Sequence, residues 1–212
     1  MSLVQALLQE KVIAIVRGIP AERADHVAEA LRAGGIRFIE VTMNTPGAID
    51  ILRQWRRDYA GKMFVGAGTV LNQALARQAI DAGAEFLVTP NVKEAVIQEG
   101  IAAGVDVYPG AMTPTEIAEA CECGAQAVKV FPAGSLGSRY FKELQGPLGH
   151  IPMIAVGGIG LENMSEYARA GARAFGMGGS LVRMDWVLQG DYARLREHAR
   201  AVVQAARDLQ TQ

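Results

Sequence analysis

The fold is decided by a stretch that reads GAEFLVTPNVKEAVIQEGIAAGVDVYPGAMTPTEIAEACECGAQAVKVF, residues 83–131. Three apolar runs lie in it: Glu85–Val88, Val105–Tyr108 and Ala127–Phe131. Each run comes shortly after a glycine (Gly83, Gly104, Gly124) that follows a segment of helical length, as a glycine that ends a helix in the left-handed conformation does. Short apolar runs between helices are typical of buried parallel strands. The stretch therefore predicts alternating strands and helices.

The same unit extends in both directions along the chain. Similar junctions occur at Gly34, Gly61, Gly83, Gly104, Gly124, Gly149 and Gly171. The remaining apolar runs are Val12–Val16, Ile36–Met43, Met63–Gly66, Met153–Val156 and Ala174–Met177. Eight such units of about 25 residues favour an α/β fold, a closed (β/α)8 TIM barrel. An open doubly wound sheet is the alternative, but no Rossmann-type glycine fingerprint opens the chain.

The length and composition fit one barrel domain over residues 1–212. We expect Ser2–Glu10 to form an N-terminal helix that caps the barrel and Asp191–Leu209 to form the eighth helix. The net charge of −1 argues against general nucleic-acid binding, which needs a dominant positive field. The N-terminus lacks the pattern of a secretory signal, and no apolar window is long enough to predict a membrane span.

Enzymes with this fold carry their chemistry at the C-terminal ends of the strands. Lys129 lies there, inside the apolar run Ala127–Phe131. Burial lowers a lysine pKa, and a neutral amine attacks carbonyl groups to form an imine. Strand position alone equally permits a structural lysine in a buried ion pair.

Glu40 ends the run Ile36-Arg-Phe-Ile-Glu on the second predicted strand and shares a face with Ile36 and Phe38. If that face points into the barrel, its carboxylate can serve as general acid and base beside an imine-forming lysine. The simpler alternative is a Lys129–Glu40 salt bridge, and one pair can fill both roles.

Glycine-rich loops follow the seventh and eighth predicted strands, Gly157–Gly160 and Gly176–Ser180. Barrels bind phosphate at these loops through backbone N–H groups and a helix N-terminus, and the Ser180 hydroxyl adds a donor. Tight turns without a ligand are the alternative.

Arg17, after the first strand, is a candidate to hold a substrate carboxylate bidentately, with Thr69 and Thr89 as further donors. The alternative is an arginine at the rim that pairs with a surface acid. No metal or other cofactor is expected, because His26, His150 and His198 all lie away from the strand ends.

A series of motifs runs through the chain in order: Ile39–Met43 (IEVTM), Val65–Leu71 (VGAGTVL), Val88–Asn91 (VTPN), Pro109-Gly110, Thr113–Glu116 (TPTE), Val128–Ala133 (VKVFPA), Val156–Ile159 (VGGI) and Gly178–Ser180 (GGS). On these motifs the sequence, from Ile13 to Val182, resembles the 2-keto-3-deoxy-6-phosphogluconate (KDPG) / 4-hydroxy-2-oxoglutarate (KHG) aldolase family, class I barrel enzymes.

The resemblance implies a role for each matching residue. Lys129 would form the imine and Glu40 would be the general base. Thr69 would contact the substrate carboxylate, and Pro90 and Phe131 would line the pyruvyl pocket. Gly158, Gly179 and Ser180 would receive the phosphate. The resemblance also implies a cytoplasmic homotrimer in sugar-acid catabolism of the Entner–Doudoroff kind.

One position departs from the pattern. Many gluconate-type members carry an arginine four residues after the glutamate, where this chain has Asn44. Asn44, Arg17–Ile19 and Thr89–Asn91 are similar to the 2-keto-3-deoxy-6-phosphogalactonate branch. The sequence thus leaves the sugar epimer open.

The leading hypothesis is a Schiff-base aldolase that cleaves a phosphorylated 2-keto-3-deoxy sugar acid to pyruvate and glyceraldehyde 3-phosphate. The alternatives are cleavage of unphosphorylated 4-hydroxy-2-oxoglutarate to pyruvate and glyoxylate, and a barrel without catalysis that only binds sugar phosphates. The expected partners are small molecules, with no nucleic acid and no membrane.

Overall fold

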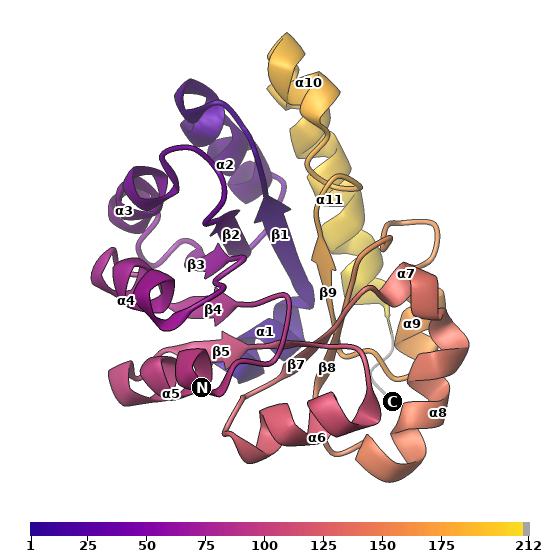
Figure 1. Cartoon of the computed structure of the whole chain (residues 1–212). Helices are drawn as coiled ribbons and strands as arrows, with labels where there is room; N and C mark the ends of the chain where they lie inside the picture. The colour runs from indigo at the N-terminus through magenta and orange to yellow at the C-terminus, as the bar shows by residue number, and fades with distance from the viewer. Residues whose placement is uncertain (210–212) are drawn as a thin grey trace.

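The computed structural model describes residues 1–209, and its strands and helices alternate along the chain (Figure 1). The strands are β1 Val12–Val16, β2 Phe38–Thr42, β3 Phe64–Gly68, β4 Phe86–Val88, β5 Asp106–Tyr108, β6 Gly110–Ala111, β7 Val128–Val130, β8 Met153–Val156 and β9 Ala174–Met177. All strand pairs are parallel. The predicted (β/α)8 barrel is confirmed.

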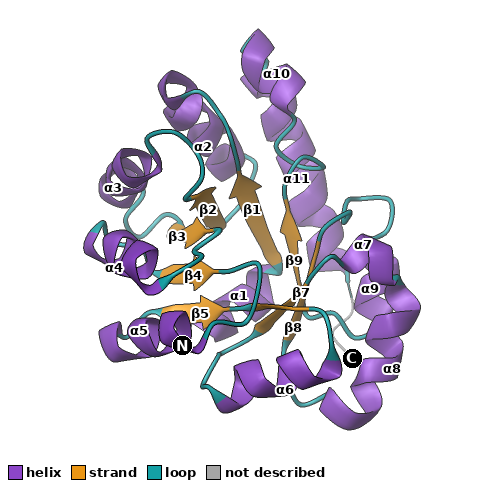
Figure 2. Cartoon of the chain, in the orientation of Figure 1, coloured by secondary structure: helices purple, strands orange, loops and turns teal. Residues whose placement is uncertain are grey.

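Helices surround the strands (Figure 2). They are α1 Leu3–Glu10, the 3-10 turn η1 Ala21–Arg23, α2 Ala24–Ala33, α3 Ala48–Asp58, α4 Gln73–Asp81, α5 Glu94–Ala103, α6 Pro114–Glu122, α7 Ala133–Leu136, α8 Ser138–Leu148, α9 Met164–Arg169, α10 Met184–Gln189 and α11 Tyr192–Asp208. No helix within residues 1–209 is both long and apolar enough to cross a bilayer.

The barrel closes through a strand that is interrupted at Pro109. The strand order runs from β5 through β1 to β6. The predicted fifth strand, Val105–Tyr108, corresponds to β5, and β6 continues it beyond Pro109. Proline has no N–H to donate to a neighbouring strand. Its carbonyl still accepts from the Lys129 backbone N–H at 2.9 Å, so the chain itself completes the ring.

Side chains alternate between two buried layers. One cluster lies between strands and helices, and the other fills the barrel interior. In the interior, the rings of Phe38 and Tyr108 each lie 5.7 Å from that of Phe86. Leu7 from α1 joins this cluster, as expected for a capping helix. Ile36 packs in the outer layer, so its predicted place on the Glu40 face is wrong: β2 begins only at Phe38.

Five of the seven junction glycines have the expected positive φ. Gly34 and Gly149 do not, with φ of −78° and −63°. At Gly34 the reason is packing, because a Cβ there would lie 2.5 Å from the Ala199 Cβ of α11. The neighbouring Gly35, with φ of 97°, makes the turn instead.

Candidate active site

Lys129 projects into the barrel from the middle of β7. Its neighbours Val128 and Val130 pack outward, and its own side chain is only 6% exposed. The Nζ atom lies 4.8 Å from the centroid of the Phe131 ring. Burial lowers the pKa of the amine, the positive charge of Arg17 lowers it further, and Glu40 opposes the shift. The site thus shifts the amine towards its neutral, nucleophilic form.

Glu40 enters the same space from β2 and is 2% exposed. Burial raises its pKa to about 7, while the charges of Lys129 and Arg17 pull it down. Its Oε2 atom is buried without a hydrogen-bond partner in the described part of the chain. Among residues 1–209, Glu40 and Lys129 form no ion pair within 4 Å. The structure therefore does not contain the simple Lys129–Glu40 salt bridge.

A glycine on the adjacent strand makes room for this carboxylate. A Cβ built on Gly68 of β3 would lie 2.2 Å from Oε1 of Glu40. Gly66, two residues earlier, makes room for an aromatic ring instead, because a Cβ built on it would lie 2.5 Å from the Phe86 ring. Gly68 lies in the motif Val65–Leu71, but this role was not predicted from the sequence. An inward-facing glycine inside a strand is the signal that could have found it.

Arg17 and Thr69 bring the ends of β1 and β3 together. The Nη2 atom of Arg17 donates to Oγ1 of Thr69 at 3.3 Å, and Thr69 has a φ of 57°, which is rare for a residue with a side chain. A second link was missed from the sequence. The Gly18 N–H donates to the Thr45 hydroxyl at 2.9 Å, and the Thr42 and Thr45 hydroxyls lie 3.0 Å apart.

Thr89 does not fit its predicted role as a carboxylate donor. Its hydroxyl donates to the Asn91 carbonyl at 2.5 Å and accepts the Gly110 N–H at 3.2 Å. These bonds position the loop that contains Pro90, which is half-buried. Asn44, at the departure from the gluconate-type pattern, is exposed.

The two glycine-rich loops line one pocket of about 480 Å³. Its lining residues include Arg17, Phe131, Gly158, Gly179 and Ser180, so five of the predicted binding residues converge. Within residues 1–209, the N–H groups of Gly158, Gly179 and Ser180 donate to no backbone carbonyl, which leaves them available to an anion.

Two details of this pocket differ from the prediction. The Ser180 hydroxyl donates to the Ile159 carbonyl at 2.5 Å and must turn before it can donate to a ligand. The segment after β9 forms a turn, with Leu181 and Val182 both bonded to the Gly178 carbonyl, and α10 begins only at Met184. The expected helix N-terminus is therefore absent from this loop, and its free donors come from the turn.

A model of the KDPG and KHG aldolase family matches residues 3–198. The chain belongs to this family. An Escherichia coli 2-dehydro-3-deoxy-6-phosphogalactonate aldolase is 36% identical over 209 residues, with 92% of this chain and 94% of the relative covered. A Treponema pallidum 2-dehydro-3-deoxy-phosphogluconate aldolase is 37% identical over 193 residues, covering 90% and 91%.

A solved structure agrees with the barrel and with the family. KDPG aldolase from Legionella pneumophila, with pyruvate captured as a covalent carbinolamine intermediate, superposes with a TM-score of 0.85 at 25% identity. The match covers 99% of each chain. The resemblance read from the sequence motifs is thus confirmed, and the KDPG/KHG relatives are named aldolases, which are lyases.

Proposed function

We propose that this KDPG/KHG-family protein is a class I aldolase that forms an imine between Lys129 and a 2-keto-3-deoxy-6-phospho sugar acid. The products are pyruvate and glyceraldehyde 3-phosphate. One observation carries the proposal: an amine and a carboxyl group, both buried at the C-terminal end of the barrel, have pKa values shifted towards their neutral forms. Such opposed shifts are typical of catalytic groups.

The reaction follows from these two groups. The neutral amine of Lys129 adds to the C2 carbonyl to give a carbinolamine, which loses water to give the protonated imine. Glu40, with a pKa of about 7, both gives and takes protons near neutral pH. As a carboxylate, Glu40 accepts the C4 hydroxyl proton while the C3–C4 bond breaks. The electron pair of that bond moves towards the imine and forms the enamine, and the aldehyde leaves. Protonation at C3 and hydrolysis then release pyruvate and free Lys129.

The remaining residues bind the two ends of the substrate. Arg17 and Thr69 are placed to hold the carboxylate, with Pro90 and Phe131 around the pyruvyl group. The N–H groups of Gly158, Gly179 and Ser180 receive the phosphate. The Legionella aldolase, with pyruvate held as a carbinolamine, supports attack by an amine in this family.

Reductive trapping tests the imine. Borohydride with pyruvate should abolish activity and add the mass of a reduced pyruvyl group at Lys129 alone. Lys142, which is exposed on α8, is the internal control. An active enzyme without an adduct on Lys129 would refute the imine mechanism.

The substrate is tested by comparing kcat/KM for the gluconate-type phospho acid, the galactonate-type phospho acid and unphosphorylated 4-hydroxy-2-oxoglutarate. We expect both phospho acids to exceed the unphosphorylated acid, because only they engage the free N–H groups of the loops. The two relatives, with 36% and 37% identity, do not separate the epimers. The proposal includes a homotrimer, which light scattering should show as three times 22.6 kDa.

A further inference from the structure

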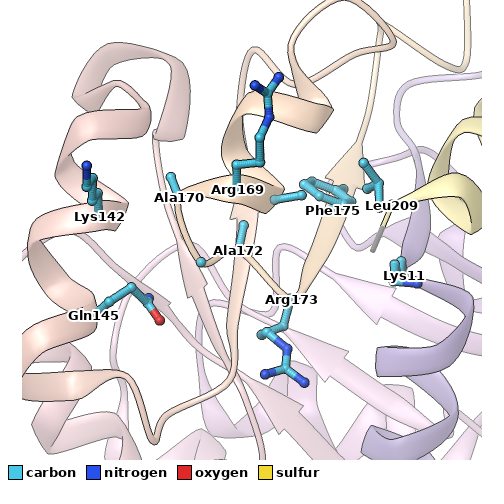
Figure 3. Close-up of a pocket in the computed structure, with 11 residues that line it drawn as sticks. Lys11, Lys142, Gln145, Arg169, Ala170, Ala172, Arg173, Phe175 and Leu209 are labelled. Carbon is cyan, nitrogen blue, oxygen red and sulfur yellow. The ribbon is translucent and has the colours of Figure 1, made fainter. Parts of the chain in front are cut away.

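A second pocket, of about 460 Å³, is drawn in Figure 3. Lys11 and Arg173, which line it, immediately precede β1 and β9, so the pocket lies at the N-terminal ends of the strands. The helices α8 and α9 and the end of α11 complete its wall. It shares no lining residue with the pocket at the glycine-rich loops.

All charged residues that line this second pocket are cations. They are Lys11, Lys142, Arg169 and Arg173. The whole chain holds 22 acids against 21 lysines and arginines, so a mixed set would be expected. In the part of the chain that the structure describes, none of these four cations forms an ion pair, although eight other arginines do. Like charges without counter-charges repel, and a bound anion relieves that repulsion.

The floor of the pocket is neutral. Figure 3 shows the four cations around Ala170, Ala172, Phe175 and Leu209, with the Gln145 amide at one side. Gly171 lets that amide approach the turn, because a Cβ there would lie 2.2 Å from the Gln145 Cδ. The N–H groups of Ala172, Arg173 and Phe175 are already bonded to carbonyls. Recognition of an anion here therefore depends on side chains, and two arginines with two lysines suit phosphate oxygens.

We propose that this pocket binds a small phosphorylated metabolite with at least two negative charges, at a site independent of the aldolase chemistry. The volume lies within the range of about 300–1,000 Å³ of small-molecule sites. A nucleic-acid backbone instead needs an extended positive surface, and the net charge of −1 does not favour one. The neutral floor accommodates the uncharged part of the metabolite.

Inorganic pyrophosphate is the probe, and lysine acetylation followed by mass spectrometry locates its binding. At constant ionic strength, pyrophosphate should protect Lys11 and Lys142 from acetylation but leave Lys62 and Lys93 unprotected. This readout separates the second pocket from any phosphate bound at the glycine-rich loops. Equal protection of all four lysines would reduce the effect to general charge screening and overturn the proposal.

Paired variants sharpen the test. Arg169→Gln with Arg173→Gln should raise the pyrophosphate concentration needed for protection by about tenfold or more. Arg53→Gln with Arg57→Gln, which removes two exposed arginines of α3, should not change it. Both double variants should keep aldolase activity within about twofold.

Two outcomes would overturn the proposal. The first is protection that survives in Arg169→Gln with Arg173→Gln. The second is stronger protection by duplex DNA than by pyrophosphate.

Discussion

Inside the barrel, the N-terminal half holds large side chains such as Leu7, Phe38 and Phe86, whereas the C-terminal half holds Glu40 and Lys129 beside apolar residues such as Ile15 and Val156. The same strands supply both halves. On β2, Phe38 is followed two residues later by Glu40, and Ala127, directly before β7, is followed two residues later by Lys129. Because side chains alternate along a strand, residues two positions apart face the same side. In each pair, the first residue packs in the apolar interior and the second is an ionisable residue of the candidate active site.

The difference between the two halves has an energetic meaning. The aromatic cluster is apolar and tightly packed, so its burial stabilises the fold. Glu40 and Lys129 are buried without an ion pair between them, so each shifts its pKa instead of keeping a solvated charge. The packed half thus offsets the cost of holding two reactive groups away from water.

The largest expected effect comes from removing the amine. Lys129→Met keeps the length of the side chain but not its nucleophile, so kcat/KM should fall by about 10⁴-fold or more. The free energy of unfolding should not fall, because an apolar group replaces a buried amine. Steady-state kinetics and urea unfolding measure the two quantities. Retained activity would contradict the imine and favour a barrel that only binds sugar phosphates.

The packed half should respond in the opposite way. Leu7→Ala removes a fully buried side chain from the interior cluster and should lower the free energy of unfolding by about 2–5 kcal/mol. It should leave kcat/KM within about twofold at a temperature where the variant is folded. Gln9→Ala, at an exposed position of α1, is the matched control. A large loss of kcat/KM in folded Leu7→Ala protein would show that the two halves are not separable.

Much of this division could be predicted from the sequence. The eight apolar runs located the strands. The alternation in the second run allowed Glu40 to face inward, and the apolar neighbours of Lys129 indicated that it is buried. These are local properties, set by burial and by the period of a strand. The interruption of the fifth strand was not predicted, although Pro109 is visible in the sequence, because the run was ended at Tyr108.

The features that were not predicted depend on contacts and hydrogen bonds between different segments of the chain. That Gly68 faces the Glu40 carboxylate follows from the pairing of β2 with β3. That the Thr89 and Ser180 hydroxyls are engaged follows from the Asn91 and Ile159 carbonyls, which a motif does not reveal. Sequence patterns identify which residues face a site, whereas hydrogen-bond partners require the packed chain.

Two glycine substitutions on β3 compare the two halves of the barrel interior, because Gly68 lies beside Glu40 and Gly66 lies beside Phe86. Gly68→Ala places a methyl group against the Glu40 carboxylate, and a displacement of about 1 Å should lower kcat by about 10²-fold. It should also slow deuterium exchange of the pyruvate methyl group, because that exchange needs the base at the enamine. Borohydride trapping of pyruvate on Lys129, measured at equilibrium, should persist.

Gly66→Ala is the matched control, because its clash is with the Phe86 ring and not with Glu40. It should lower the free energy of unfolding by about 1–3 kcal/mol and leave the pH profile of kcat/KM unchanged. Equal effects of the two variants on kcat and on exchange would mean that Gly68 has no specific part in positioning Glu40.

The smallest expected effect is a gain in stability on removing the buried acid. The pKa of Glu40 is raised from 4.5 to about 7, so between these values the folded protein binds more protons than the unfolded chain. Wild-type stability should therefore fall as pH rises through this window. Glu40→Gln should remove that slope and increase the free energy of unfolding at about pH 8 by on the order of 1–3 kcal/mol, while it lowers kcat. Glu22→Gln, at an exposed position, should leave the slope in place. If Glu40→Gln instead destabilises the protein at pH 8, the carboxylate stabilises the fold through Lys129 and Arg17, and burial is not the dominant influence on it.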